Sequence, residues 1–394
     1  MRSNSMGERV YLDWNATAPL RPEARAAMVA ALDACGNPSS VHAEGRAARR
    51  LIETAREQVA ALVGANPRNV VFTSGGTEAN VLALSPATAT GREPAPRLLV
   101  SAIEHPSVLA GGRFPPAAVE KIDVTADGRI DLAALGDRLA ALARAGKGPP
   151  LVSLMAANNE TGVVQPVSEA ARLVHEAAGF LHVDAVQAAG KIPCDLNGLE
   201  ADLLTLSGHK IGAPKGVGAL IKRAEALQLD PLIKGGGQER SARAGTENVA
   251  AIAGFGAAAA AAKANAGAEH ARMVALRDQL ETGLKAATPA AVIFGADGAR
   301  LPNTTLVALV GMKAETAVIA FDLDGIAVSS GAACSSGKVA ASHVLAAMGV
   351  APELARAAIR VSLGWNTSES EVDRLVAAWI RLAEALPKRQ AIAA

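Results

Sequence analysis

The sequence has little of the residues that mark several specialised classes of protein. Aromatic residues make up 3% of its 394 positions, with a single tyrosine, and there are three cysteines. Cys35, Cys194 and Cys334 lie far apart, are odd in number and show no CxxC spacing. This arrangement favours neither a disulfide framework nor a zinc site, so we expect no bound metal and a reducing, cytoplasmic environment.

An excess of charge of one sign is also absent. The 39 lysines and arginines against 38 aspartates and glutamates give a formal net charge of +1. Nothing in this balance indicates a nucleic-acid partner or a polybasic membrane anchor. No apolar run reaches the length of a membrane span, and the opening MRSNSMGER lacks the apolar core of a signal peptide. We therefore expect no association with a membrane.

What the sequence does contain is enough apolar residues for a large core. Half of the residues are hydrophobic and 20% are charged, which indicates a globular protein, and the length favours two domains. Between Val70 and Leu220, short apolar strands alternate with amphipathic helices, as in a mostly parallel sheet covered on both faces. The predicted strands are 70–73, 98–101, 151–155, 181–184 and 203–206. The predicted helices begin after Thr77 and cover 131–145 and 168–178.

The pattern changes past a long helical region that extends to about Ala287. A helix of roughly 247–266 contains the run Ala257–Ala262, which we interpret as structural filler, and helical pattern continues to about Ala287. The remainder mixes short strands with helices, which is typical of a smaller α+β domain. Its predicted strands are 291–294, 305–309 and 326–330, and its predicted helices are 314–323, 342–348 and 368–385.

The stretch Asp202–Leu220, DLLTLSGHKIGAPKGVGAL, is the centre of the functional prediction. Its apolar run stops at Ser207-Gly208-His209-Lys210, and the glycines and proline that follow exclude a long helix. A lysine at such a tip is fixed by a rigid strand while its amine can reach a ligand. If burial frees that amine of its proton, it can form a Schiff base with an aldehyde. The alternative is an ordinary solvated lysine.

Two upstream patterns complete the outline of a pyridoxal phosphate site. A short apolar strand ends at Asp184, and a carboxylate paired with the ring nitrogen keeps this cofactor an effective electron sink. Further upstream, a strand runs into Thr73–Asn80, TSGGTEAN, which predicts a glycine turn, a helix start and a phosphate-binding cup. Taken singly, the aspartate is equally a cap and the glycines an ordinary turn. Their order along the chain favours the cofactor site.

Eight segments together resemble the successive signature blocks of the cysteine desulfurases. They are FTSGGTEAN, SAIEHPSV, NNETGVVQP, HVDAVQAAGK, SGHK, RAGT, SSGAACSSG and IRVSLG. The similarity runs from Tyr11 to about Gly364 and implies the aspartate-aminotransferase fold, fold type I, with pyridoxal 5'-phosphate as cofactor. It implies a large domain, residues 16–262, built on a mostly parallel seven-stranded sheet. A small α+β domain, residues 1–15 and 263–394, would carry the catalytic cysteine.

The resemblance also implies roles for individual residues. Gly76, Thr77, Ser207 and His209 would hold the phosphate, and Thr246 would reach it from the neighbouring subunit of a homodimer. His105 would stack on the cofactor ring and move protons, although a histidine before proline is more often structural. The residues expected near the ring and its phenolic oxygen are His105, Asn159, Asp184, Gln187 and Lys210.

Asn37, Asn159 and Arg360 are the residues that the resemblance assigns to the substrate. Arg360 stands alone in the apolar strand Ile359–Ser362, and a buried guanidinium needs an anion. A substrate α-carboxylate matches its two parallel donors. The alternatives are a structural salt bridge for Arg360 and an ordinary turn for Asn37.

Cys334 lies among small residues in SSGAACSSG, which favours a reagent over a core position. By resemblance, Lys210 abstracts the α-proton of L-cysteine and the Cys334 thiolate takes the sulfur as a persulfide. L-Alanine leaves, and the sulfur passes to an acceptor protein such as an iron–sulfur scaffold. The block differs from the RSGHHC type of the second desulfurase class. A selenocysteine lyase, another fold-type-I enzyme such as an aminotransferase, and a non-catalytic scaffold remain the alternatives.

Overall fold

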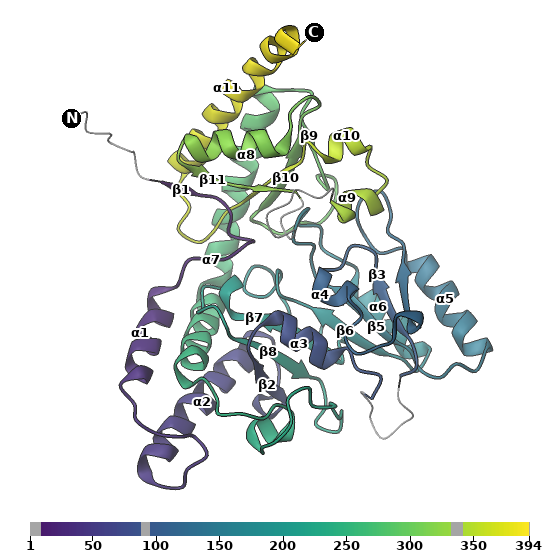
Figure 1. Ribbon diagram of the computed structural model, residues 1–394, viewed down its shortest axis with the longest axis vertical. Helices are drawn as coiled ribbons and strands as arrows, with labels where there is room; N and C mark the ends of the chain where they lie inside the picture. Colours follow the sequence, from purple (N-terminus) through teal and green to yellow (C-terminus); the bar gives the residue numbers. More distant parts are fainter. Residues whose placement is uncertain (1–8, 88–94, 332–341, 394) are drawn as a thin grey trace.

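The computed structural model of this chain describes residues 9–87, 95–331 and 342–393 (Figure 1). Cys334, the predicted nucleophile, lies outside these residues. A central seven-stranded sheet has the order β2-β8-β7-β6-β5-β3-β4. Its strands are β2 (Val70–Thr73), β3 (Leu98–Ser101), β4 (Val119–Ile122), β5 (Leu151–Met155), β6 (Phe180–Asp184), β7 (Leu203–Ser207) and β8 (Gly218–Lys222). Only β8 runs antiparallel to its neighbours, so the predicted mostly parallel sheet is confirmed.

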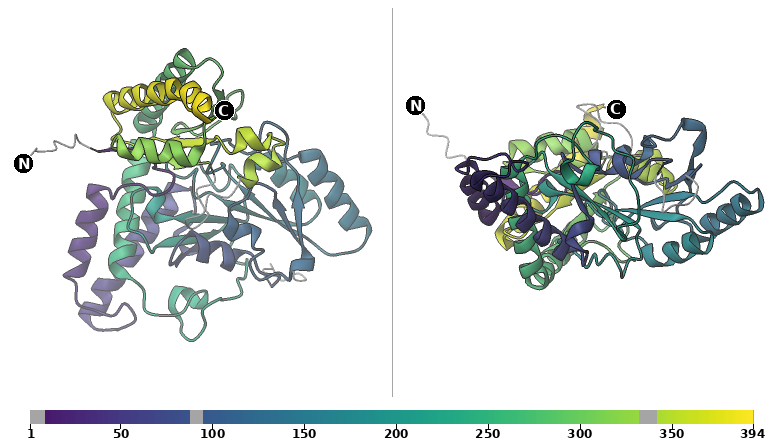
Figure 2. Two further views of the ribbon diagram at one scale, coloured as in Figure 1. Left: turned by 45° about the horizontal axis from the view of Figure 1, so that its top comes forward. Right: turned by 90° about the horizontal axis from the view of Figure 1, so that it is seen from below.

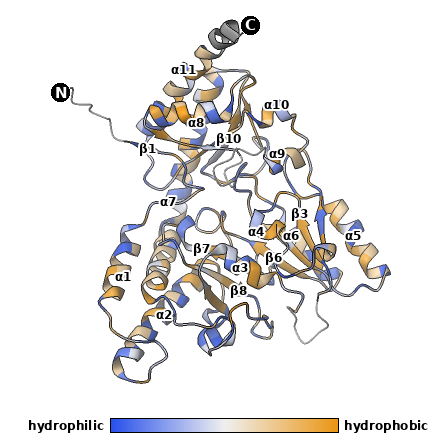
Figure 3. Ribbon diagram, viewed as in Figure 1, coloured by the Kyte–Doolittle hydropathy of each residue, from blue (hydrophilic) through white to orange (hydrophobic). Residues whose placement is uncertain are grey.

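Helices cover both faces of this sheet (Figures 1 and 2). Because successive side chains of a strand point to opposite faces, Leu151 packs with α3 while Val152 and Leu154 pack with α2, α5 and α6. Every residue of β5, β6 and β7 is buried, and the strands are largely orange in the hydropathy colouring of Figure 3. The helices of this part are α1 (Pro22–Leu32), α2 (Ala43–Leu62), α3 (Gly76–Ala83), α4 (Pro106–Leu109), α5 (Leu132–Arg144) and α6 (Val167–Glu176), with short 3₁₀ turns at Pro67–Asn69, Pro116–Ala118, Gly208–Lys210 and Gln238–Ser241.

Strand β4 is absent from the sequence prediction. It lies at the edge of the sheet, and only Ile122 of Val119-Glu120-Lys121-Ile122 is buried. Charged side chains on an edge strand oppose pairing with other molecules, but they also hide the apolar pattern of a strand.

Helix α7 (Val249–Ala287) is one continuous helix of 39 residues that links the two parts of the molecule (Figure 1). The predicted domain boundary after residue 262 falls inside it and stays a prediction. A Cβ on Gly256 would lie 2.6 Å from the Ala55 Cβ of α2, so α7 and α2 pack too closely there for a larger residue. In the alanine run itself, Ala258, Ala259 and Ala262 are fully buried, so the run has a packing role as well as a filling one.

By length and composition alone, α7 is also apolar enough to cross a membrane. Within the molecule, 56% of its most apolar 18-residue stretch is buried, and α7 packs against α1 and α2. Such burial is typical of a core helix of a globular protein.

The second part contains a four-stranded antiparallel sheet of order β12-β13-β10-β9 and a parallel pair of β1 with β11. The predicted single strand 326–330 is wrong in one respect, because it divides at Val328 between these two sheets. Val10 and Leu12 of the N-terminal arm belong to one hydrophobic cluster with residues of α7, α8 and α11. The elements are β1 (Val10–Tyr11), β9 (Val292–Ile293), β10 (Thr304–Ala308), β11 (Ile326–Ala327), β12 (Ser329–Ser330), β13 (Ile359–Ser362), α8 (Ala314–Leu323), α9 (His343–Ala347), α10 (Pro352–Ala355) and α11 (Glu369–Ala393).

Candidate active site

A cavity of about 570 Å³ lies where β6 and β7 end, and strand β13 and the N-terminal arm complete its wall. This is the edge at which open α/β sheets bind ligands. Ten of the residues expected to bind cofactor or substrate line it: Gly76, Thr77, His105, Asn159, Asp184, Gln187, Ser207, His209, Lys210 and Arg360. The structure thus gathers side chains that are separated by up to 284 positions in the chain.

Lys210 is the last residue of the 3₁₀ turn that follows β7. Its Nζ donates hydrogen bonds to the backbone oxygens of Asn15, at 2.5 Å, and Ala16, at 2.8 Å. Strand β7 is paired on both sides, by β6 and β8, so the backbone that carries this lysine is held firmly. Gly212 lets the chain turn back immediately, with a positive φ of 83° and Trp365 where a Cβ would stand.

Asp184 ends β6 at the floor of the cavity and is 6% exposed. Its Oδ1 accepts a hydrogen bond from the backbone N–H of Val186, and its Oδ2 accepts one from the Nδ2 of Asn80 at 2.9 Å. Asn80 also donates to Ser107. No role is predicted for Asn80 from the sequence, although Asn80 lies one helical turn after Gly76 on the same face of α3, and the helical period could have revealed it.

A cup for an anion forms where β2 turns into α3. Space is open at the position of a Cβ on Gly75, and a Cβ on Gly76 would lie 3.1 Å from Val186 and 3.2 Å from Ser207. The first backbone N–H groups of a helix point outward and carry partial positive charge, so the start of α3 suits a phosphate.

His209 lies on the opposite side of this cup. Burial, with a smaller contribution from the charges of Lys210 and Lys215, lowers the pKa of His209 to about 4. Its Nδ1 lies 3.1 Å from the hydroxyl of Thr17. The imidazole is therefore neutral at pH 7 and acts in the cup as a hydrogen-bonding group.

His105 caps the start of α4 through its ring. Its Nδ1 accepts a hydrogen bond from the backbone N–H of Ser107 at 3.1 Å, so the neutral ring carries its proton on Nε2. Burial is the largest cause that lowers the His105 pKa, against the raising effect of Asp184. A neutral imidazole with a fixed tautomer can lie against a ligand ring or accept a proton.

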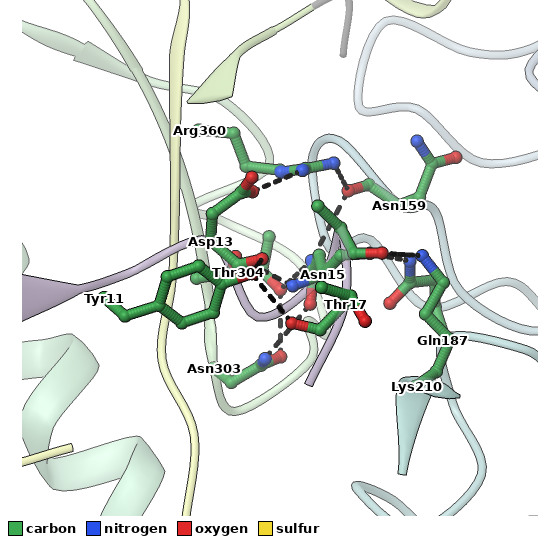
Figure 4. Close-up of polar contacts among 12 residues, drawn as sticks. Tyr11, Asp13, Asn15, Thr17, Asn159, Gln187, Lys210, Asn303, Thr304 and Arg360 are labelled. Carbon is green, nitrogen blue, oxygen red and sulfur yellow. Dashed lines mark hydrogen bonds and ion pairs between the residues drawn. The ribbon is translucent and has the colours of Figure 1, made fainter. Parts of the chain in front are cut away.

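Arg360 forms the structural salt bridge that was one of its two predicted roles, and it also lines the cavity. Its Nη2 forms a salt bridge to Asp13 Oδ1 at 2.8 Å, and its Nη1 donates to the backbone oxygen of Asn159 at 3.0 Å (Figure 4). Its side chain is 2% exposed, and its Nε has no hydrogen-bond partner among the described residues. A structural salt bridge is therefore present, and the guanidinium still faces the cavity with capacity for a carboxylate.

Asn15 connects the two parts of the site, as Figure 4 shows. Its backbone oxygen accepts from Lys210 and from Gln187 Nε2, while its side chain donates to Thr304 Oγ1 at 2.9 Å. Its backbone N–H donates to Ser362 at 3.0 Å. No local signal in the sequence ties Asn15 to Lys210 and Gln187, which lie 195 and 172 positions away.

Two predicted residues are not brought into this cavity by the chain itself. Asn37 lies in the loop between α1 and α2, where its Oδ1 accepts from the backbone N–H of Ser39. Thr246 is exposed on the segment between β8 and α7. Their proposed roles, one toward the substrate and one in a neighbouring subunit, stay predictions.

The described residues fit pyridoxal phosphate. A buried carboxylate, an amine on a rigid strand end and an anion cup share one cavity, and its volume falls within the range of about 300–1,000 Å³ usual for small-molecule sites. Within the described part of the chain, no group of three or more histidine, cysteine, aspartate or glutamate side chains is placed to hold a metal ion.

Comparisons with known proteins agree with this geometry. A family model described as aminotransferase class-V matches residues 10–375. A cysteine desulfurase of Cereibacter sphaeroides is 47% identical over 380 residues, 94% of this chain and 94% of that protein. A cysteine desulfurase of Gluconacetobacter diazotrophicus is 44% identical over 375 residues, 93% of this chain and 91% of that protein. The X-ray structure of a NifS-like protein from Rickettsia africae is 37% identical, with a TM-score of 0.86 over 96% of this chain and 100% of that one.

Proposed function

Because the chain belongs to the class-V aminotransferase family and is a pyridoxal-phosphate-dependent cysteine desulfurase, we propose that it moves the sulfur of L-cysteine onto Cys334 and from there to an acceptor protein. The observation that carries this proposal is the convergence of Lys210, Asp184 and Arg360 on one cavity. An amine, a carboxylate and a guanidinium in one cavity are what an amino-acid substrate and this cofactor require.

The residues that would hold the cofactor all line the cavity. The start of α3 with Gly76 and Thr77, together with Ser207 and His209, would bind the phosphate, and Asp184 would pair with the ring nitrogen. Asn80 holds Asp184 through a 2.9 Å hydrogen bond, which keeps the carboxylate aimed at the cavity. When bound, pyridoxal phosphate supplies the electron sink that makes the α-proton of an amino acid acidic.

Lys210 and Arg360 would handle the substrate. The guanidinium and the Asn159 side chain would fix the α-carboxylate, which leaves the α-carbon near the amine of Lys210. That amine would attach the cofactor before reaction and then take the α-proton. His105, whose ring accepts a hydrogen bond from Ser107 and whose pKa is lowered by burial, would lie against the ring face and relay a proton.

Sulfur transfer requires a second nucleophile, and the sequence offers Cys334. Its thiolate would attack the sulfur of the bound substrate, forming the S–S bond of a persulfide. The substrate Cβ–S bond breaks, its electron pair stays on carbon, and protonation gives alanine. Neither of the other cysteines suits this step, because Cys35 is exposed outside the cavity lining and burial raises the pKa of the Cys194 thiol to about 12.

The finer parts of the proposal concern partners. We propose a homodimer in which Thr246 contacts the phosphate of the neighbouring site, since Thr246 is exposed and does not line the cavity of its own chain. We further propose a cytoplasmic enzyme whose persulfide serves iron–sulfur cluster or other thio-cofactor assembly. The separated cysteines and the persulfide chemistry support a reducing compartment.

Replacing the nucleophile tests the proposal. Cys334→Ser should bind the cofactor and stay yellow, and its absorbance should still shift on addition of L-cysteine, because the cavity is intact. Formation of both persulfide and alanine should fall at least about a hundredfold, since a hydroxyl attacks sulfur far more slowly than a thiolate. Cys35→Ser and Cys194→Ser are the matched controls and should keep wild-type rates. Alanine release from cysteine by Cys334→Ser at the wild-type rate would favour the selenocysteine-lyase alternative.

A further inference from the structure

A second lysine lies behind the wall of the active-site cavity. Lys191 ends the motif HVDAVQAAGK and is partly buried. Its Nζ donates to Gln187 Oε1 at 2.9 Å and to Asn15 Oδ1 at 3.0 Å. With Lys210 it also lines a small second cavity of about 20 Å³, which contains Trp365 in its wall. Nothing in the proposed reaction so far uses this residue.

The first consequence concerns the orientation of Gln187. A glutamine amide can turn by 180° and exchange its donor and acceptor ends, but an ammonium group only donates. Lys191 therefore fixes Oε1 on its own side, and Nε2 donates to the backbone oxygen of Asn15 at 3.0 Å. The Nε2 group has two hydrogens, and Gln187 lines the main cavity. The second N–H is thus available to a ligand oxygen there.

The second consequence concerns charge. Burial lowers the pKa of Lys191 well below its usual range, and the positive charges of Lys210 and Arg360 lower it further. The two oxygens that accept hydrogen bonds from its Nζ, Gln187 Oε1 and Asn15 Oδ1, stabilise the ammonium form against these effects. The other charged groups nearby are Arg21 and Glu269, which bind each other at 2.7 Å and line the small cavity. His270, on α7, contacts the backbone oxygen of Lys191 through its ring. Repulsion between two amines is mutual, so a proton on Lys191 disfavours a proton on Lys210.

We propose that Lys191 is a positioning residue, which turns the donor edge of Gln187 toward the cofactor's ring oxygen and favours the neutral amine of Lys210. The inference rests on the proposed attachment of the cofactor at Lys210. It assigns one residue to two requirements of that attachment: a hydrogen-bond donor in the right direction and a lysine ready to react.

The first test measures Lys210 without the cofactor. The unloaded protein is treated with a small amine-reactive reagent over a range of pH, and labelling of the Lys210 peptide is followed by mass spectrometry. Lys191→Met and Lys191→Gln should move the midpoint of labelling upward by about one pH unit, which is about a tenfold slower rate below the midpoint. Lys191→Arg keeps a charge and should restore the wild-type midpoint. Lys263→Met, which removes a lysine that donates to the Ala61 carbonyl outside the cavity, is the matched control.

The second test separates orientation from charge in the loaded enzyme. Lys191→Gln retains a donor for Oε1 of Gln187, whereas Lys191→Met does not. The visible absorbance band of the bound cofactor and its pH midpoint should therefore change more in Lys191→Met than in Lys191→Gln. If Lys191→Met folds poorly, the comparison of Lys191→Gln with Lys191→Arg still tests the charge.

Identical labelling curves for Lys191→Gln, Lys191→Arg and the wild type would overturn the role in charge, and an unchanged absorbance band in Lys191→Met would overturn the role in orientation. Failure of the proposed function has a different signature. In that case the wild-type protein makes no alanine from cysteine, whatever the labelling of Lys210 shows.

Discussion

Arg360 carries a buried positive charge. Asp13 balances this charge on one side, and the guanidinium also lines the active-site cavity. Removal of one partner of a buried ion pair leaves an uncompensated charge, at a cost of about 3–5 kcal/mol for a fully buried pair. Asp13 is 20% exposed, so the cost of its removal is smaller than this. The carboxylate of a bound amino acid can replace the Asp13 carboxylate in part as the partner of Arg360.

This leads to a prediction for Asp13→Asn. The free energy of unfolding should fall by about 1–3 kcal/mol, and L-alanine should raise the unfolding temperature of the variant more than that of the wild type, because the ligand's carboxylate supplies the missing charge. Thermal unfolding with and without L-alanine measures both effects. Asp127→Asn, which breaks the exposed pair with Arg129, is the control. Equal stability of the two variants would contradict a buried role for Asp13.

Glu160 makes the stability of the folded protein depend on pH. Burial raises its pKa to about 7, although Ser342 donates a hydrogen bond to its Oε2. The folded protein therefore keeps a proton on Glu160 between about pH 4.5 and 7, where the unfolded chain loses it. Stability falls as the pH rises through this window and is level above it. The shift corresponds to about 3 kcal/mol.

Replacement of Glu160 by glutamine should remove this slope. Glu160→Gln should gain stability relative to the wild type as the pH rises from 4.5 to 8, and denaturant unfolding at a series of pH values measures the difference. Glu57→Gln, at an exposed position of α2, should leave the slope unchanged. A parallel pH profile for Glu160→Gln and the wild type would show that the carboxyl is not protonated in the folded state.

At the scale of single residues, the sequence predicted the cavity lining where a side chain follows a strand or begins a helix. Lys210, Asp184 and Gly76 all occupy such positions. Asn15 could not be found in this way, because its partners depend on how the N-terminal arm packs between the two parts of the molecule. Asp13 was hidden for the same reason, since its distance from Arg360 along the chain is 347 residues.

At the scale of elements, the segment between β8 and α7 is held in an unusual conformation. Glu239, Arg240 and Ser241 have positive φ angles of 45°, 53° and 64°, a region that residues other than glycine rarely adopt. The Glu239 carboxylate binds the buried Arg56 with two hydrogen bonds of 2.8 Å and accepts a third from the backbone N–H of Phe72. The burial of this pair anchors the segment that carries Thr246.

Glu239→Gln should therefore release the segment. Loss of the charge leaves the buried Arg56 with the 39% exposed Glu53 as its remaining carboxylate partner. We expect up to about 3–5 kcal/mol of destabilisation and faster cleavage by trypsin after Arg240 or Arg243. The double variant Arg56→Met with Glu239→Gln should recover part of the stability, because it removes the unpaired charge. Glu225→Gln is the control, because Glu225 forms an exposed ion pair with Arg68 at 3.9 Å. Cleavage of Glu239→Gln at the wild-type rate would show that the ion pair does not hold the segment.

The elements that the sequence misread are those whose environment is not local. Strand β4 carries charges because it is an edge, and residues 326–330 divide because the N-terminal strand β1 pairs with only the first part. The buried strands β5, β6 and β7 were found because both faces are covered, which makes every residue apolar or hydrogen-bonded.

At the scale of the whole molecule, the alternation of strands and helices determined the large sheet, and the change of pattern after α7 marked the smaller part. What the pattern could not provide was the place where the two meet. That contact passes through Asn15, which bonds to Lys210 on one side and to Thr304 and Ser362 on the other. It is a property of the assembled fold.

The proposed homodimer makes the last prediction, because a shared site can be rebuilt from two defective subunits. Lys210→Ala lacks the reactive amine, and Thr246→Val lacks the phosphate contact that it would lend to its neighbour. In a mixed dimer, the subunit with Lys210 intact receives Thr246 from the Lys210→Ala subunit, so one complete site forms. Alanine formation after mixing and subunit exchange should approach half of the wild-type value per dimer. Light scattering checks that the species is a dimer.

The control places both changes in one subunit. When wild-type protein is mixed with the double variant Lys210→Ala and Thr246→Val, each mixed dimer has one site without the amine and one without the threonine. Its activity per dimer should be about half of that of the Thr246→Val dimer, which has two sites without the threonine. Sharing across the interface predicts this asymmetry, whereas a threonine that serves its own subunit predicts the reverse, with a complete site in the control mixture and none in the first. The comparison of the two mixtures therefore decides which subunit Thr246 serves.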